Sequence, residues 1–215
     1  MSDVSVSILD CDFSKLEKEF YHINQTNAKY IHIDIMDGIF VDRNTEKIFD
    51  INKIKVLTDK YIDIHLMVNK PKKYILYFSK YNPDIISFHI ESIENIDQNI
   101  SLIKSYGIKC GIAINPDSDI DKIENYLNKI DLILIMSVEP GKGGQNFKLE
   151  TFNKLEFLKQ KIINNNLKTK IEVDGGVNIS NSKQLNNLGA DILVSGSYLV
   201  KHNSIKKAVN SLLKV

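Results

Sequence analysis

The stretch YIHIDIMDG, residues 30–38, places a histidine and an aspartate two residues apart in a run that otherwise has the composition of a buried strand. Isoleucines alternate with His32, Asp34 and Met36, so a strand of period 2 directs the isoleucines to one face and these three residues to the other. Burying two ionisable groups is unfavourable unless they are paired or bind a metal. The stretch therefore predicts partners for His32 and Asp34 elsewhere in the chain.

Two further strand-like runs supply such partners. YIDIHLM carries His65 and IEVDGGV carries Asp174, each at an alternating position near the end of its run. Two imidazoles and two carboxylates, His32, Asp34, His65 and Asp174, form a donor set typical of a divalent transition-metal site. The alternative is that each is a hydrogen-bonded polar residue of the core.

Glycine-rich turns follow three later strand-like runs, in EPGKGGQ, in Gly175-Gly176 and in Gly196-Ser197. Backbone N–H groups at glycines can approach an anion closely, and such turns bind phosphate. Arg43 is the only arginine, so phosphate would be held mainly by backbone amides. Ordinary turn glycines are the alternative at each of these places.

Three of the four methionines, Met36, Met67 and Met136, lie at the ends of strand-like runs. Methionine most often fills space in a core. At strand ends beside the polar cluster, these three could instead form an apolar lining that keeps water from a reactive intermediate.

Short β-branched runs alternate with longer stretches of helical period along the chain. The expected strands are 4–9, 30–35, 61–67, 84–90, 109–115, 131–138, 169–174 and 191–196. The expected helices are 14–25, 51–60, 71–80, 95–107, 119–129, 148–165, 180–189 and 204–214. Eight such units predict a single α/β domain over 1–215, a closed (β/α)8 TIM barrel, whose functional residues gather at the C-terminal ends of the strands. The runner-up is a doubly wound open sheet, for which the sequence has no GxGxxG motif.

The composition narrows the class of protein. Hydrophobic residues make up 43% of the 215 residues, and the formal net charge is +1, so the chain favours a folded core and no nucleic-acid partner. No apolar run is long enough to span a membrane, and the first residues do not have the pattern of a signal peptide. Cys11 and Cys110 have no metal-type spacing. We therefore expect a reduced, cytoplasmic protein.

Together these motifs resemble the ribulose-phosphate 3-epimerase family over essentially the whole chain. The resemblance rests on six stretches in order: SILDCDF (7–13), HIDIMDG (32–38), DIHLMV (63–68), MSVEPGKGGQ (136–145), IEVDGGVN (171–178) and GADILVSGS (189–197). It implies a TIM barrel of the ribulose-phosphate-binding type and an isomerase of carbohydrate metabolism, in the pentose phosphate pathway. The implied reaction interconverts D-ribulose 5-phosphate and D-xylulose 5-phosphate through an enediolate.

The resemblance also implies roles for individual residues. One divalent ion (zinc, iron(II), manganese or cobalt) is expected to be bound by His32, Asp34, His65 and Asp174, with Asp34 and Asp174 as the catalytic acid–base pair at C3. The expected substrate-binding residues are Ser7, Met36, His65, Met67, Met136, Gly141, Lys142, Gly143, Gly144, Gly175, Gly176, Gly196 and Ser197. The family also implies a homo-oligomer.

Four positions depart from the family pattern. Ile39 replaces a histidine and Asp42 a proline in the loop after MDG, Lys142 stands where an aromatic residue is common, and Asp10 stands where a small residue is usual. These differences predict altered loop closure, sugar preference or subunit contacts, and they leave the four expected metal ligands in place.

Three other functions can be compared with the sequence. An epimerase for a related substrate such as a hexulose 6-phosphate is compatible with the changed loop. A barrel decarboxylase would need a lysine among the carboxylates of residues 30–38, which is absent. A non-catalytic phosphosugar-binding or scaffold protein would have no need for both Asp34 and Asp174.

Overall fold

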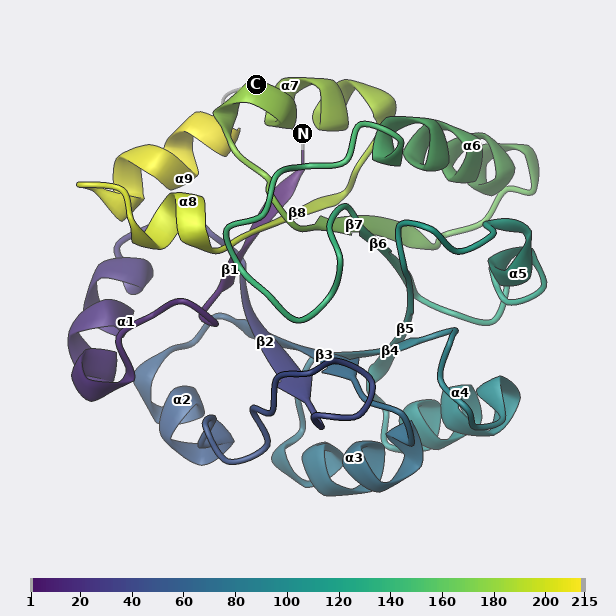
Figure 1. Ribbon diagram of the computed structural model, residues 1–215, viewed down its shortest axis with the longest axis horizontal. Helices are drawn as coiled ribbons and strands as arrows, with labels where there is room; N and C mark the ends of the chain where they lie inside the picture. Colours follow the sequence, from purple (N-terminus) through teal and green to yellow (C-terminus); the bar gives the residue numbers. More distant parts are fainter. Residues whose placement is uncertain (1, 214–215) are drawn as a thin grey trace.

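The computed structural model describes residues 2–213 and shows a closed barrel of parallel strands surrounded by helices (Figure 1). The strands pair in chain order, and the last, β8, pairs with β1. They are β1 (Asp3–Ser7), β2 (Tyr30–Met36), β3 (Tyr61–Met67), β4 (Ile85–His89), β5 (Lys109–Ile114), β6 (Leu132–Met136), β7 (Lys170–Asp174) and β8 (Ile192–Ser195). The predicted TIM barrel is confirmed, and the open-sheet alternative is wrong.

Helices follow the strands around the outside of the barrel (Figure 1). They are α1 (Leu16–Asn24), α2 (Ile51–Leu57), α3 (Pro71–Phe78), α4 (Ile96–Ser105), α5 (Asp121–Glu124), α6 (Thr151–Asn164), α7 (Ile179–Leu188), α8 (Ser197–Val200) and α9 (Ile205–Leu213), with 3₁₀ turns η1 (Phe13–Lys15) and η2 (Ser79–Tyr81). The short helix α8 was not expected from the sequence. Residue 214 of the expected helix 204–214 lies outside the described residues.

Several expected helices are shorter than the pattern suggests; the helix expected over 51–60, for example, ends at Leu57. The helix expected over 119–129 contains only α5, and turns follow it, with the N–H of Lys129 donating to the carbonyl of Tyr126 at 2.8 Å. Asn125 and Asn128 lie in this segment, and asparagine favours turns over helix interiors. The helix expected from 148 begins three residues later, because the Lys148 N–H donates to the Ser137 carbonyl at 2.8 Å.

The alternation in β2 separates the two faces of the barrel wall. Ile31, Ile33 and Ile35 belong to the main hydrophobic core. His32 and Asp34 are buried as well, but they stand at the alternate positions, which point into the barrel. The isoleucine layer therefore fixes the register that turns the polar residues inward.

The register between β2 and β3 sets polar groups side by side. His32 pairs with Asp63, and Asp34 pairs with His65, so the inward polar residues of the two strands lie at matching levels. Met36 pairs with Met67 one level higher, at the C-terminal ends of both strands. These ends open towards the loops that form the mouth of the barrel.

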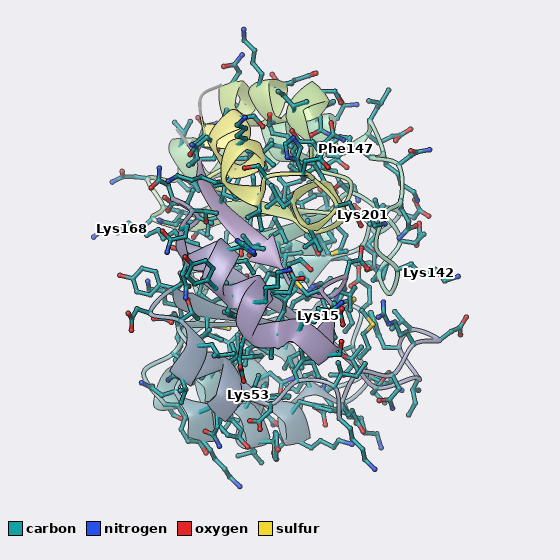
Figure 2. All side chains as sticks on the ribbon, turned by 90° about the vertical axis from the view of Figure 1, so that its left-hand side faces the viewer. Lys15, Lys53, Lys142, Phe147, Lys168 and Lys201 are labelled. Carbon is teal, nitrogen blue, oxygen red and sulfur yellow. The ribbon has the colours of Figure 1, made fainter. Side chains whose placement is uncertain are left out.

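The two ends of the barrel differ in chemistry. Tyr30, Ile85, Leu132 and Ile192 form a separate buried apolar cluster at the N-terminal ends of their strands. Figure 2 shows the barrel from the side, with Lys168, just before β7, at one end and Lys142, in the loop after β6, at the other. In the described part of the chain, none of the helices has the length and apolar character needed to cross a bilayer.

Candidate active site

A cavity of about 350 Å³ opens at the mouth, where the C-terminal ends of the strands meet their loops. The loop between β6 and α6 extends across the barrel interior in the axial view (Figure 1). All of the expected substrate-binding residues except His65 line this cavity: Ser7, Met36, Met67, Met136, Gly141, Lys142, Gly143, Gly144, Gly175, Gly176, Gly196 and Ser197. Asp34 and Asp174 line it as well.

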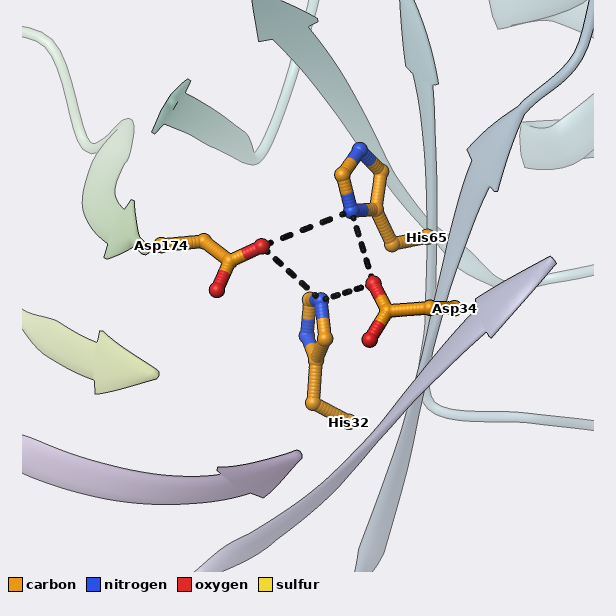
Figure 3. Close-up of side chains that lie close together, drawn as sticks. All are labelled: His32, Asp34, His65 and Asp174. Carbon is orange, nitrogen blue, oxygen red and sulfur yellow. Dashed lines mark ion pairs between the residues drawn. The ribbon is translucent and has the colours of Figure 1, made fainter. Parts of the chain in front are cut away.

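The four expected metal ligands lie close together and point towards one another (Figure 3). Oδ1 of Asp34 lies 3.3 Å from Nε2 of His32 and 3.3 Å from Nδ1 of His65. Oδ2 of Asp174 lies 3.7 Å from each of the same two ring nitrogens. All four donor atoms lie within 4.8 Å of one another.

These separations fit a divalent ion. Donors bonded at about 2.0–2.1 Å in a tetrahedral zinc site lie about 3.3 Å apart. Among residues 2–213, the buried atoms His32 Nε2, Asp34 Oδ1 and His65 Nδ1 have no hydrogen-bond partner, although each faces the common centre. A cation at that centre satisfies the three atoms together, so the residues present are suited to a metal site.

Hydrogen bonds with neighbouring residues determine which ring nitrogen of His32 and which carboxylate oxygen of Asp34 face the centre. The Nδ1–H of His32 donates to Oδ2 of Asp63 at 2.6 Å, which leaves Nε2 directed at Asp34 and Asp174. The Ser7 hydroxyl donates to Oδ2 of Asp34 at 3.0 Å, so Oδ1 is the oxygen that faces the imidazoles. Ser7 therefore orients a proposed ligand from β1, as well as lining the cavity.

The proximity of these groups changes their acidity. Burial opposes the charge on His32, but the carboxylates of Asp63 and Asp34 outweigh it and raise the pKa of the imidazole. Burial also disfavours the Asp34 carboxylate, yet His32 and His65 keep its pKa below the ordinary value. Burial raises the pKa of Asp174 to about 7 against the attraction of His32, and burial lowers the pKa of His65. The two aspartates thus differ strongly in proton affinity.

The glycine turns bring three loops together at one side of the mouth. Gly176 has φ +61°, and a Cβ there would lie 2.7 Å from the backbone nitrogen of Phe147. Only glycine allows the loop after β7 to pass so close to the loop after β6. Ser197, at the start of α8, lies beside the same cavity.

Sequence reasoning missed the role of Asp10. Its carboxylate accepts a hydrogen bond from the Ser197 hydroxyl and occupies the space that a side chain at Gly143 would need. Asp10 therefore places a negative charge among the residues expected to hold phosphate. Its unusual type at that position was a signal, but the sequence did not show which way the side chain points.

Two other residues, His89 and Asp63, lie behind the cluster and contact its imidazoles. The Nε2 atom of His89 lies 2.8 Å from Nε2 of His65, and its Nδ1 atom lies 3.2 Å from Oε2 of Glu91. Asp63, which the sequence did not single out, is the hydrogen-bond partner of His32. Lys142, in contrast, is exposed at the rim of the mouth and points outward (Figure 2).

Comparisons with known proteins give concordant results. The sequence model described as "Ribulose-phosphate 3 epimerase family" matches residues 3–200. Ribulose-phosphate 3-epimerase of Bacillus subtilis is 37% identical over 213 residues, which cover 99% of this chain and 98% of the relative. The protein of the same name from Synechocystis is 38% identical over 208 residues, covering 96% and 90%. That of Methanocaldococcus jannaschii is 35% identical over 212 residues, covering 99% and 90%.

Solved structures resemble the fold at much lower identity. KGPDC from Streptococcus mutans has a TM-score of 0.72 at 11% identity, with 100% of this chain and 96% of that chain covered. Orotidine 5'-phosphate decarboxylase from Pyrococcus horikoshii has a TM-score of 0.69 at 12% identity, with 97% and 96% covered. At these identities the similarity concerns the barrel alone.

Proposed function

The chain belongs to the ribulose-phosphate 3-epimerase family, and from this membership we propose how its own residues interconvert D-ribulose 5-phosphate and D-xylulose 5-phosphate. The observation that carries the proposal is the convergence of Asp34 and Asp174, from β2 and β7, on one buried centre shared with two imidazoles. Inversion at a carbon next to a ketone needs a proton taken from one face and another returned to the opposite face. Two carboxylates on different walls of the barrel meet that need.

One aspartate removes the C3 proton, and the other, protonated, delivers a proton to the opposite face. Their strands are separated by β1 and β8 around the barrel, so the two carboxylates approach a substrate in the mouth from different sides. A positioned acid or base contributes about 10²–10⁴ to the rate. The hydrogen bond from Ser7 holds Asp34 in the orientation needed for this transfer.

His32, Asp34, His65 and Asp174 hold one divalent ion, which we propose to be zinc, iron(II), manganese or cobalt. When bound, such an ion supplies Lewis acidity that stabilises negative charge on the oxygens of an enediolate. The buried atoms that lack partners in the described chain support this assignment.

The phosphate group binds at the glycine loops after β6, β7 and β8, where backbone amides line the cavity together with Ser197. Met36, Met67 and Met136 are buried around the reacting end, and they keep water from the intermediate. Residues 1–215 act as one catalytic domain, and we further propose a homo-oligomer in the cytoplasm. The buried free thiols Cys11 and Cys110 are consistent with a reducing compartment.

The test uses purified protein, stripped of metal and reloaded with each candidate ion, mixed with D-ribulose 5-phosphate in D₂O and followed by NMR. Metal-dependent formation of D-xylulose 5-phosphate with deuterium at C3 supports both the reaction and the proton transfer. Folded protein that turns over only a hexulose 6-phosphate would point to a different substrate. Stoichiometric metal binding with no turnover of either sugar would support a binding protein instead.

A further inference from the structure

A chain of three polar side chains leads from the proposed metal centre to the rim of the barrel. Nε2 of His65 lies 2.8 Å from Nε2 of His89, and Nδ1 of His89 lies 3.2 Å from Oε2 of Glu91. His65 and His89 are fully buried, and the side chain of Glu91 is 18% exposed. The ring of Phe40 packs against His89, with the ring centroids 4.7 Å apart. The chain therefore crosses from β3 to β4 inside the protein.

The acceptor at the end of this chain determines where each hydrogen lies. The second oxygen of Glu91, Oε1, accepts the backbone N–H of Asn115 at 2.9 Å. Burial opposes the charge of Glu91, but His89 and the hydrogen bonds from Ser118 and the Asn115 N–H together outweigh it and lower the pKa of Glu91 to about 2. An ionised carboxylate only accepts hydrogen bonds, so His89 must carry its hydrogen on Nδ1.

The same reasoning extends to His65. With its hydrogen on Nδ1, His89 has only a lone pair on Nε2, so the hydrogen between the two rings belongs to Nε2 of His65. Nδ1 of His65 then keeps its lone pair, and this is the nitrogen that faces Asp34 and Asp174. A metal ion binds an imidazole only through such a lone pair.

We propose that Glu91 and His89 are positioning residues that fix the tautomer of His65, so that its Nδ1 is available to a divalent ion. The inference rests on the proposed function, because it requires a metal at the four-residue centre. Asp63 does the same for His32 through a direct hydrogen bond of 2.6 Å. The two ligand imidazoles thus depend on two separate carboxylates, one acting directly and one through a second imidazole.

Glu91→Gln provides a sharp test because the amide cannot satisfy both neighbours as the carboxylate does. Its oxygen keeps the hydrogen bond from the Asn115 N–H, so its NH₂ group turns to His89 and donates to Nδ1. His89 must then carry its hydrogen on Nε2, and Nε2 of His65 must accept it. The hydrogen of His65 moves to Nδ1, the nitrogen that the metal needs.

The experiment titrates metal-stripped protein with Zn²⁺ in competition with a chelator, and it records ¹⁵N NMR spectra of the histidine rings. Outer partners of metal-binding histidines contribute about 10–100-fold to affinity, so Glu91→Gln should weaken Zn²⁺ binding by that factor. Glu94→Gln is the matched control: Glu94 lies in the same loop, and its carboxylate accepts the Lys72 N–H without contacting His89. Its Zn²⁺ affinity should equal that of the wild type.

The NMR spectra of the wild type keep the inference testable even if Glu91→Gln does not fold. We expect His89 with hydrogen on Nδ1 and His65 with hydrogen on Nε2; a hydrogen on Nε2 of His89 overturns the inference. Folded Glu91→Gln that binds Zn²⁺ like the wild type, or that loses affinity with both tautomers unchanged, overturns it too. Failure of the wild type to bind Zn²⁺ at the centre would instead refute the metal site of the proposed function.

Discussion

Replacing each aspartate of the pair separately distinguishes the two-base scheme from every scheme with one base. Asp34→Asn and Asp174→Asn each remove a carboxylate that can carry a proton, and each keeps an oxygen at the same place. Loss of one positioned acid or base lowers epimerisation about 10²–10⁴-fold. Since each tenfold change corresponds to about 1.36 kcal/mol of activation free energy, the loss is roughly 2.7–5.4 kcal/mol.

The geometry predicts more than a loss of rate. Asp34 and Asp174 stand on β2 and β7, so each is expected to serve one face of C3. In either variant the remaining aspartate can still remove a proton from the epimer that presents its hydrogen to that face. That aspartate exchanges the proton with solvent and returns it to the same face. Each variant should therefore introduce deuterium at C3 of one epimer without forming the other epimer.

The assay follows both epimers separately in D₂O by NMR, with wild-type and variant proteins at matched metal content. Asp34→Asn and Asp174→Asn should label opposite epimers. If both label the same epimer, or if either variant epimerises at nearly the wild-type rate, the assignment of one aspartate to each face is wrong. Thermal melting and metal analysis exclude loss of the fold or of the ion as the cause of a low rate.

Three other predictions concern the phosphate end, the barrel interior and the buried thiols. Asp10→Ser removes a carboxylate beside Ser197 and Gly143. Because this negative charge repels a phosphate group, KM for the substrate should fall by roughly tenfold while kcat changes little. A higher KM in the variant would contradict this prediction. Gly111→Ala places a Cβ 2.9 Å from Cβ of Ser87. Denaturant unfolding should therefore show a free energy of unfolding lower by about 1–3 kcal/mol, which adding Ser87→Gly should partly restore. An unchanged denaturation midpoint would contradict this prediction. The side chain of Cys110 is 0% exposed, and burial raises the pKa of its thiol to about 12. Mass spectrometry should therefore find that iodoacetamide alkylates Cys110 only after denaturant is added. Labelling of Cys110 in the folded protein would contradict this prediction.

The sequence was sufficient for the barrel and for the four converging donors because both follow from local rules. Alternation with period 2 decides which residues of a strand point inward, and parallel strands end at a common mouth. His32 and Asp34 could therefore be placed together with His65 and Asp174 before their distances were known. The same rule directs Asp63 inward, but it does not say that the carboxylate contacts His32, because that depends on the register between β2 and β3.

Residues outside the strands were harder to interpret. The function inferred for Glu91 depends on a path through His89 to His65 and on an anchor to the backbone of Asn115. No spacing along the chain encodes such a path. The position of Asp10 likewise depends on how closely the loop after β6 approaches it at Gly143. Turns and loops are set by tertiary contacts, so their side-chain partners appear only in the folded structure.

The barrel interior explains why these ionisable groups interact so strongly. Below them, an apolar layer closes the N-terminal end of the barrel; it consists of Tyr30, Ile85, Leu132 and Ile192. Above them, three methionines form the apolar lining of the mouth: Met36, Met67 and Met136.

Charges between two apolar layers are poorly screened, so each group is stable only through its neighbours. Asp63 stabilises His32 through a direct hydrogen bond. In the part of the chain that the structure describes, Glu172 has no cation close enough to offset its burial, and burial raises the pKa of its carboxyl group. An interior arranged in this way is costly to the fold unless a cation balances the carboxylates. A divalent ion held by the four proposed ligands would supply that cation, so the layering of the barrel supports the proposed metal site as much as the chemistry at its mouth does.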